Sequence, residues 1–170
     1  MTLPSRNADR QQISKTQRTF FVTTKTSMGR RLLQTDRNAE LLADVLRRCV
    51  AARRFLVHDF VIMPDHIHVL VTVNEDSSVE KAMQFIKGGF SYRLKKELGY
   101  LGEVWQRGFS EVRVEDDESF RCHREYIAQN PVRAGLVSSS ELFRWCFESL
   151  RREKAAGAKA HSVLAPVRHE

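Results

Sequence analysis

Two histidines one residue apart, His66 and His68, are the side chains in this sequence best suited to chemistry. They belong to the apolar run of residues 66–73, whose pattern predicts a β-strand. In a strand, side chains at positions i and i+2 point to the same face, roughly 6.6 Å apart at about 3.3 Å per residue. Two imidazoles on one face can share a metal ion, since imidazole is the commonest metal ligand. The pair alone leaves a second interpretation open, in which both rings are structural and partly solvated.

The predicted strand is divided between packing and chemistry. The residues that alternate with the histidines are apolar and should face a core: Ile67, Val69, Val71 and Val73. Just before the strand, Pro64 fixes its own φ angle and Asp65 tolerates turn geometry. Residues 55–63 and 66–73 are therefore expected to form a β-hairpin, with the histidines immediately after its turn.

A helix expected over residues 117–129 offers a second group of reactive side chains. Acidic residues at its start favour the helix dipole. Tyr126 and Asn130 lie together on one side at i and i+4, with His123 nearby. If this helix packs across the histidine face, a phenol and a carboxamide meet the imidazoles. Otherwise the tyrosine is an ordinary boundary aromatic, and the asparagine ends the helix before Pro131.

Periodicity elsewhere predicts the elements that position these groups. Residues 19–26 and 109–114 have the composition and alternation of strands. An amphipathic helix is expected over residues 38–50, and a longer one over 78–98 begins with a capping box and ends at Gly99. The order β-α-β-β-α-β is that of an α+β, ferredoxin-like antiparallel sheet. The tyrosine is carried by an appended C-terminal helix.

Length and composition favour one folded domain of 170 residues. The three cysteines, Cys49, Cys122 and Cys146, are widely spaced and indicate neither a disulfide framework nor a zinc ribbon, so we expect small buried thiols in a reducing compartment. No apolar run is long enough for a membrane helix or a signal peptide, which predicts a cytoplasmic protein without membrane contacts. Three segments are expected: a basic tail over 1–18, a domain over 19–137 and a partly disordered extension over 138–170.

The formal charge is +7 and the pI is near 9.7, which suits a polyanionic partner. Between residues 81 and 107, basic side chains are interleaved with Phe90, Tyr92 and Trp105. Such interleaving is typical of single-stranded nucleic acid binding, where cations meet phosphates and bases stack on rings. A solvated helix face above ordinary core aromatics is the alternative.

Two strings, MPDHIHVLV at residues 63–71 and REYIAQNPVRAGLV at 124–137, resemble the single-tyrosine HUH transposases. The likeness is greatest to the branch of REP-associated tyrosine transposases. The strings between them, IKGGFSYRLKKEL and VWQRGFSEVRVEDDESF, are similar to that family as well, so the resemblance spans about residues 20–137. Two motifs in the right order and at the right spacing are more specific than either alone.

The resemblance implies a metal-dependent DNA strand transferase. His66 and His68 match the histidine pair of the family, Asn130 the polar side chain that completes its metal site, and Tyr126 its nucleophile. The expected cofactor is a divalent cation, Mg²⁺ or Mn²⁺, that polarises the phosphate. Attack by the tyrosine would yield a 5′-phosphotyrosine and a free 3′ hydroxyl, with His123 as a possible helper in proton removal.

The resemblance also implies a partner, single-stranded DNA with a REP-like hairpin. The candidates for strand contacts are basic and aromatic side chains of the long helix: Lys87, Tyr92, Arg93 and Lys95. Relatives tend to have Trp-Ser-Ser near the C-terminus, where this chain has Trp-Cys-Phe from Trp145. Both a monomer and a homodimer that exchanges tyrosine helices fit the family. Three further interpretations stay open: a relaxase or replication-initiator nickase, a domesticated relative, and a catalytically inactive hairpin-binding protein.

Overall fold

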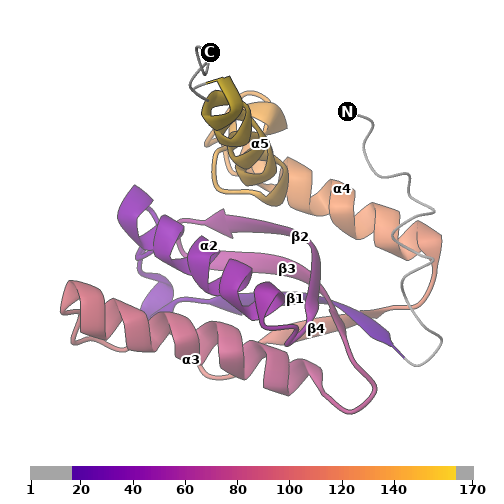
Figure 1. The fold of residues 1–170 in the computed structure, drawn as a ribbon. Coiled ribbons are helices and arrows are strands. Elements are labelled where there is room, and N and C mark those ends of the chain that lie inside the picture. The colour runs from indigo at the N-terminus through magenta and orange to yellow at the C-terminus, as the bar shows by residue number, and fades with distance from the viewer. Residues whose placement is uncertain (1–16, 164–170) are drawn as a thin grey trace, which may run out of the picture.

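The protein is built on a four-stranded antiparallel sheet with helices on both faces (Figure 1). The computed structural model describes residues 17–163, and side chains as far as residue 157. The strand order is β2-β3-β1-β4, as the predicted ferredoxin-like domain requires. The elements are β1 (Arg18–Lys25), η1 (Ser27–Gly29), α2 (Asp36–Ala51), β2 (Leu56–Met63), β3 (His66–Val73), α3 (Val79–Leu98), β4 (Ser110–Val114), α4 (Asp117–Arg133), η2 (Ser140–Leu142) and α5 (Phe147–Val163).

The turn between β2 and β3 is held by the loop that follows β1. The Leu33 N–H donates to the Pro64 carbonyl at 2.8 Å, and the Thr26 N–H donates to the Asp65 carbonyl at 2.9 Å. Both turn carbonyls therefore have backbone partners, which restrains the turn. The restrained turn therefore fixes the position of His66, the first residue of β3. The predicted hairpin is confirmed.

Helices α2 and α3 cover one face of the sheet and form the main hydrophobic core with it (Figure 1). Ile67, Val69 and Val71 point into this core and are almost fully buried. The two helices pack closely, since a Cβ atom added at Gly89 would lie 3.2 Å from Val45 Cγ1. At the end of α3, Gly99 adopts the left-handed conformation that favours glycine.

Helix α4 crosses the opposite face over a smaller apolar cluster (Figure 1). The predicted end of this helix before Pro131 is wrong, because α4 continues to Arg133. The Pro131 ring is buried, and the Ala134 N–H donates to the Asn130 carbonyl at 3.0 Å. Packing and this bond keep the last turn helical despite the proline. The cluster consists of Val61, Met63, Leu70, Val114 and Ile127.

The segment after α4 docks on the open edge of β2. The Ile62 N–H donates to the Trp145 carbonyl at 2.8 Å, and Cys146 forms a β-bridge with Val61. The Trp145 indole N–H donates to Asp36 Oδ1 at 3.0 Å, at the start of α2. Backbone pairing at an exposed strand edge satisfies groups that would otherwise be free.

Helix α5 was not predicted from the sequence. Partial disorder was expected after residue 138, yet residues 147–163 are helical. Residues 164–170 of that extension and residues 1–16 of the predicted basic tail lie outside the described residues. The cysteine prediction is also wrong in one case: Cys122 is exposed, whereas the other two thiols are half-buried. Within residues 17–163, no helix combines the length and apolar character needed to cross a membrane.

Candidate active site

Strand β3 brings the His66 and His68 rings together on the face covered by α4. Their centroids are 4.8 Å apart, with the ring planes at 76°. His68 is almost fully buried, with 5% of its surface exposed, and His66 is half-buried. The site therefore has one imidazole deep in the protein and one near solvent.

Neighbouring side chains fix which ring nitrogen of each histidine carries the proton. His66 Nδ1 lies 2.7 Å from Asp65 Oδ1, and a carboxylate can only accept, so this nitrogen donates. His68 Nδ1 lies 2.7 Å from Thr23 Oγ1, while its Nε2 faces the Asn130 Nδ2 donor at 3.2 Å. Both rings thus present an Nε2 lone pair. Such outer hydrogen bonds orient metal-binding histidines in proteins.

Burial, together with the smaller effects of the nearby charges of His66 and Lys25, lowers the pKa of His68 to about 3. A cation in this place would be removed from water without compensation, so the neutral form is favoured. Neutral imidazole is the form that binds metal ions. His68 is therefore ready to act as a ligand at physiological pH.

Helix α4 places Tyr126 beside the histidine pair. Its ring centroid lies 5.3 Å from that of His68, and 39% of the residue is exposed. The Phe21 ring lies between the two elements, 5.3 Å from His68, 5.8 Å from Tyr126 and 4.7 Å from His123. His123 Nδ1 donates to the Ser119 carbonyl at 2.7 Å, so its Nε2 carries the lone pair. The phenol can therefore be approached from solvent, with a basic nitrogen one helical turn away.

Two cations border this group. The Arg133 guanidinium carbon lies 5.5 Å from the Tyr126 ring centroid, and Lys25 pairs with His66 in the register of β1 and β3. Both side chains are exposed, and neither has a carboxylate partner in the described part of the chain. Free cations at the mouth of a site favour an anionic ligand.

The side chains around the histidine pair include the kinds of ligand that a divalent cation needs. Across the described residues, no three His, Cys, Asp or Glu side chains gather closely enough to hold a metal ion. A third ligand would therefore be the Asn130 carboxamide, which can present its oxygen by rotating half a turn at the place where its nitrogen faces His68. Two imidazole nitrogens and one amide oxygen are ordinary ligands of divalent ions and leave coordination positions open. The residues present thus fit such an ion.

The predicted DNA contacts on α3 lie on the opposite face of the sheet from this site (Figure 1). Lys87 is engaged within the protein: its ammonium donates to the carbonyls of Gln106 at 2.9 Å and Gly108 at 2.7 Å. Burial lowers the pKa of Lys87. The structure does not bring this lysine to the histidines.

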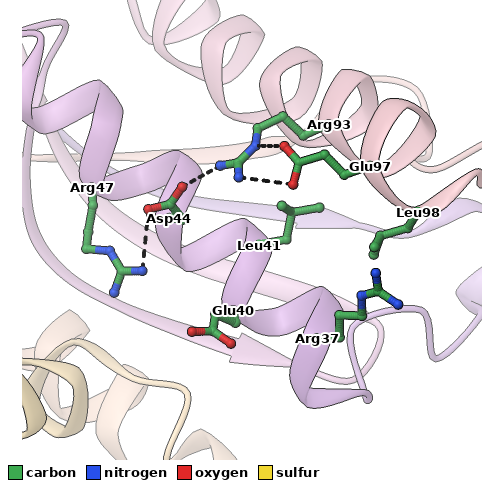
Figure 2. Close-up of a pocket in the computed structure, with 8 residues that line it drawn as sticks. All are labelled: Arg37, Glu40, Leu41, Asp44, Arg47, Arg93, Glu97 and Leu98. Carbon is green, nitrogen blue, oxygen red and sulfur yellow. Dashed lines mark hydrogen bonds and ion pairs between the residues drawn. The ribbon is translucent and has the colours of Figure 1, made fainter.

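Arg93 is held between two helices, as Figure 2 shows. It donates to Asp44 on α2 and to Glu97 on its own helix, at 2.6 Å for the latter. Tyr92 is 63% exposed and Lys95 is also exposed, so these two are the accessible members of the predicted set. The role of all four in DNA binding stays a prediction.

Sequence reasoning missed four site residues on β1 and in the turn before β3: Phe21, Thr23, Lys25 and Asp65. The first three occupy alternate positions on β1 and reach the site through its pairing with β3, which the sequence does not specify. Asp65 is adjacent to the motif and could have been found as a partner of its first histidine. Arg133 was missed too, although it follows Tyr126 and Asn130 at helical spacing.

Comparison with known proteins identifies the family of this chain. The family model described as IS200-like transposase matches residues 15–130. A Haemophilus influenzae protein described as a REP-associated tyrosine transposase is 31% identical over 105 residues, or 56% of this chain and 58% of that protein. The REP-associated tyrosine transposase of Escherichia coli K12 is 27% identical over 139 residues, covering 81% of this chain and 79% of its relative. The match thus spans little more than half the length of the Haemophilus protein.

A solved structure supports the fold. It is that of a REP-associated tyrosine transposase bound to a REP hairpin, with a TM-score of 0.66 and 24% identity, and the match covers 90% of this chain and 86% of the other. With a family model that matches well over half of its residues and the site geometry described above, this chain belongs to the IS200-like transposases and resembles their REP-associated tyrosine branch.

Proposed function

We propose that this protein is a metal-dependent DNA strand transferase that cleaves and rejoins single-stranded DNA beside a hairpin through a 5′-phosphotyrosine intermediate. The observation that carries the proposal is the convergence, within one chain, of the Tyr126 ring on His68 and of Asn130 on the same imidazole. Two relatives are described as REP-associated tyrosine transposases, and the similar solved structure holds a REP hairpin. These descriptions support hairpin DNA as the partner.

Tyr126 acts as the nucleophile. A free phenol has a pKa near 10 and attacks poorly, so it must lose its proton as the reaction begins. His123 Nε2, one helical turn earlier, or water takes that proton. A bond forms between the tyrosine oxygen and phosphorus while the bond from phosphorus to the 3′ oxygen breaks. The leaving oxygen takes up a proton and becomes a free 3′ hydroxyl. Rejoining reverses these steps and needs no ATP, because the phosphodiester energy is retained.

His66, His68 and Asn130 would hold the cofactor, Mg²⁺ or Mn²⁺. When bound, such an ion polarises the phosphate and stabilises charge on the leaving oxygen. The protein contributes orientation: Asp65 and Thr23 hold the two rings with Nε2 outward, so little rearrangement is needed. Asn130 joins α4 to β3, which couples the helix that bears the nucleophile to the ligand pair.

Arg133 and Lys25 bind the DNA backbone on either side of the reacting phosphate. A guanidinium matches two phosphate oxygens at once, whereas an ammonium acts as a point charge. Because both cations are exposed and lie at the mouth of the site, they meet the strand without rearrangement.

The residues proposed for the active site lie together within a single chain. Helix α4 packs on its own sheet through the buried Ile127 and Pro131. This packing supports a monomer that acts in cis over a homodimer that exchanges α4. Mixing Tyr126→Phe with His66→Ala protein tests the point, since neither variant should restore the other. Recovery of adduct formation in the mixture would indicate exchanged helices.

The function is tested by incubating labelled hairpin-bearing single strands with the protein and Mg²⁺ or Mn²⁺. Wild type should form a denaturant-resistant adduct that EDTA abolishes, whereas Tyr126→Phe should form none. Tyr100→Phe is the matched control, because that tyrosine packs against the main core on the other face of the sheet and its hydroxyl contacts Arg30. Unchanged cleavage by Tyr126→Phe would rule out tyrosine attack. Hairpin binding by wild type without cleavage would favour the inactive binding protein.

A further inference from the structure

A buried carboxylate that the proposed chemistry does not use lies beneath α4. Asp59 follows a register shift in β2 after Val57, and only 14% of its side chain is exposed. Its Oδ1 accepts from the Phe60 N–H at 2.9 Å, and its Oδ2 accepts from Arg124 Nε at 3.4 Å. Arg124 precedes Tyr126 by two residues, so this ion pair connects the sheet to the helix that carries the phenol.

The apolar contacts of α4 come from one side of the helix. The buried residues of the helix are Ile127 and Pro131, with Phe120 partly buried beside them. At about 100° per residue, these side chains form a narrow stripe. Arg124 lies on one flank of the stripe and Tyr126 on the other. A roll of α4 about its axis would move the phenol away from His68. The polar contacts that oppose such a roll are the Asn130–His68 hydrogen bond and the Asp59–Arg124 ion pair.

The ion pair between Asp59 and Arg124 contributes little to the stability of the fold. Burial raises the pKa of Asp59 to about 6; Arg124 opposes this shift and Glu148 on α5 adds to it. Above that pH the carboxylate is ionised where water is largely excluded, and the ionisation weakens the fold. Buried ion pairs often contribute less to stability than apolar replacements would, and some are retained for the specific geometry they impose. An account of Asp59 therefore needs a role other than stability.

We infer that the ion pair between Asp59 and Arg124 sets the rotation of α4 and so aims Tyr126 at His68. Both are positioning residues, since neither touches the reacting atoms. The inference deepens the proposed function and rests on Tyr126 being the nucleophile. Arg124 also lines a groove of about 1000 Å³ between α4, β2 and α5, so its side chain has room to leave Asp59 when the pair is broken.

The test compares Asp59→Asn with Asp44→Asn. Asp44 pairs with Arg93 between α2 and α3, so its replacement breaks an ion pair between elements on the other face (Figure 2). Asp59→Asn should slow single-turnover adduct formation by about 10- to 100-fold, the order expected for a misplaced nucleophile. Its hairpin Kd should be unchanged and its Tm at pH 7.5 should not fall. Asp44→Asn should keep the wild-type rate.

A conservative replacement separates positioning from general damage. Arg124→Lys keeps the charge and should recover part of the rate that Arg124→Gln loses. A nuclear Overhauser contact between the Tyr126 and Phe21 rings gives a readout that needs no chemistry. It should be present in wild type and absent in Asp59→Asn.

Three results would overturn the inference: a wild-type rate in Asp59→Asn, a parallel fall of its rate and Tm, or an intact ring contact. Absence of adduct in wild type would instead refute the proposed function. The ring contact would still decide whether Asp59 orients α4, because it does not depend on cleavage.

Discussion

The two faces of the sheet are built for different purposes, although a single strand, β3, contributes to both. Toward α2 and α3 it presents Ile67 and Val69 to a continuous apolar core. Toward α4 it presents His66 and His68, with far less apolar surface around them. Alternation along one strand therefore places the main packing energy on one side and the reactive groups on the other. Changes on one face should affect stability, and changes on the other should affect chemistry.

The largest effect expected from the α4 face is the loss of chemistry in His66→Ala. Charge stabilisation by a bound metal ion contributes several kcal/mol to such reactions, at about 1.4 kcal/mol per tenfold in rate. The single-turnover cleavage rate should fall by about 10³-fold. Because His66 is only half-buried, the free energy of unfolding should change by less than about 1 kcal/mol. His58→Ala is the control, because this histidine lies on β2 and its ring contacts Thr72 instead of joining the histidine pair. An equal loss of rate in His58→Ala would contradict the assignment of chemistry to His66.

The core face should respond in the opposite way to Leu94→Ala. This side chain is fully buried on α3, and such truncations cost about 3 kcal/mol from lost burial and the cavity left behind. Urea unfolding should show that loss, while the cleavage rate of the folded fraction stays within about twofold of wild type. Lys95→Ala, one residue further and exposed, should stay within about 0.5 kcal/mol. A fall in the cleavage rate of folded Leu94→Ala protein would mean that the two faces are coupled.

A pH dependence distinguishes the carboxylate of the α4 face. The native pKa of Asp59 is raised to about 6, above the unfolded value of 3.8, so the native state binds this proton more tightly. Its contribution to stability is therefore present below about pH 4 and lost as pH rises through about 6. The loss amounts to up to about 3 kcal/mol. In urea unfolding, the free energy of unfolding of Asp59→Asn should rise relative to that of wild type between pH 5 and pH 7.5. A difference that does not vary with pH would contradict this assignment.

The smallest of these effects is expected at Arg133. Its replacement by alanine removes a charged donor from the phosphate but leaves the phenol and ligands in place, so adduct formation should slow by about 10-fold. Arg133→Lys should be intermediate, since an ammonium cannot bind two oxygens in a fork. Arg121→Ala, on another side of the same helix, should keep the wild-type rate. Equal losses in the two alanine variants would indicate a general electrostatic effect instead.

Local pattern was sufficient to predict the hairpin, the six elements of the ferredoxin-like sheet and the two segments that meet at the site. Alternation puts His66 and His68 on one face, and helical spacing puts Tyr126 beside Asn130, so these relations follow from neighbours in sequence. Thr23 could not be predicted, because its contact with His68 depends on the register between β1 and β3.

Other features depended on partners distant in sequence. Arg93 is a residue type expected to contact phosphate, yet it forms an ion pair with Asp44 on another helix. The docking of Trp145 on the edge of β2 depends on a free strand edge that the sequence does not reveal. The helix continues through Pro131 because the proline ring is buried in the fold. This burial overrides the local tendency of a proline to end a helix.

The account is tested most directly by locating the covalent bond to DNA. Wild-type protein incubated with a hairpin-bearing single strand and Mn²⁺ should be digested with protease and nuclease and analysed by mass spectrometry. The account predicts a nucleotide linked through its 5′ phosphate to the peptide that contains Tyr126, together with a released strand ending in a 3′ hydroxyl. A cleaved strand with the nucleotide on another residue, or on none, would contradict it.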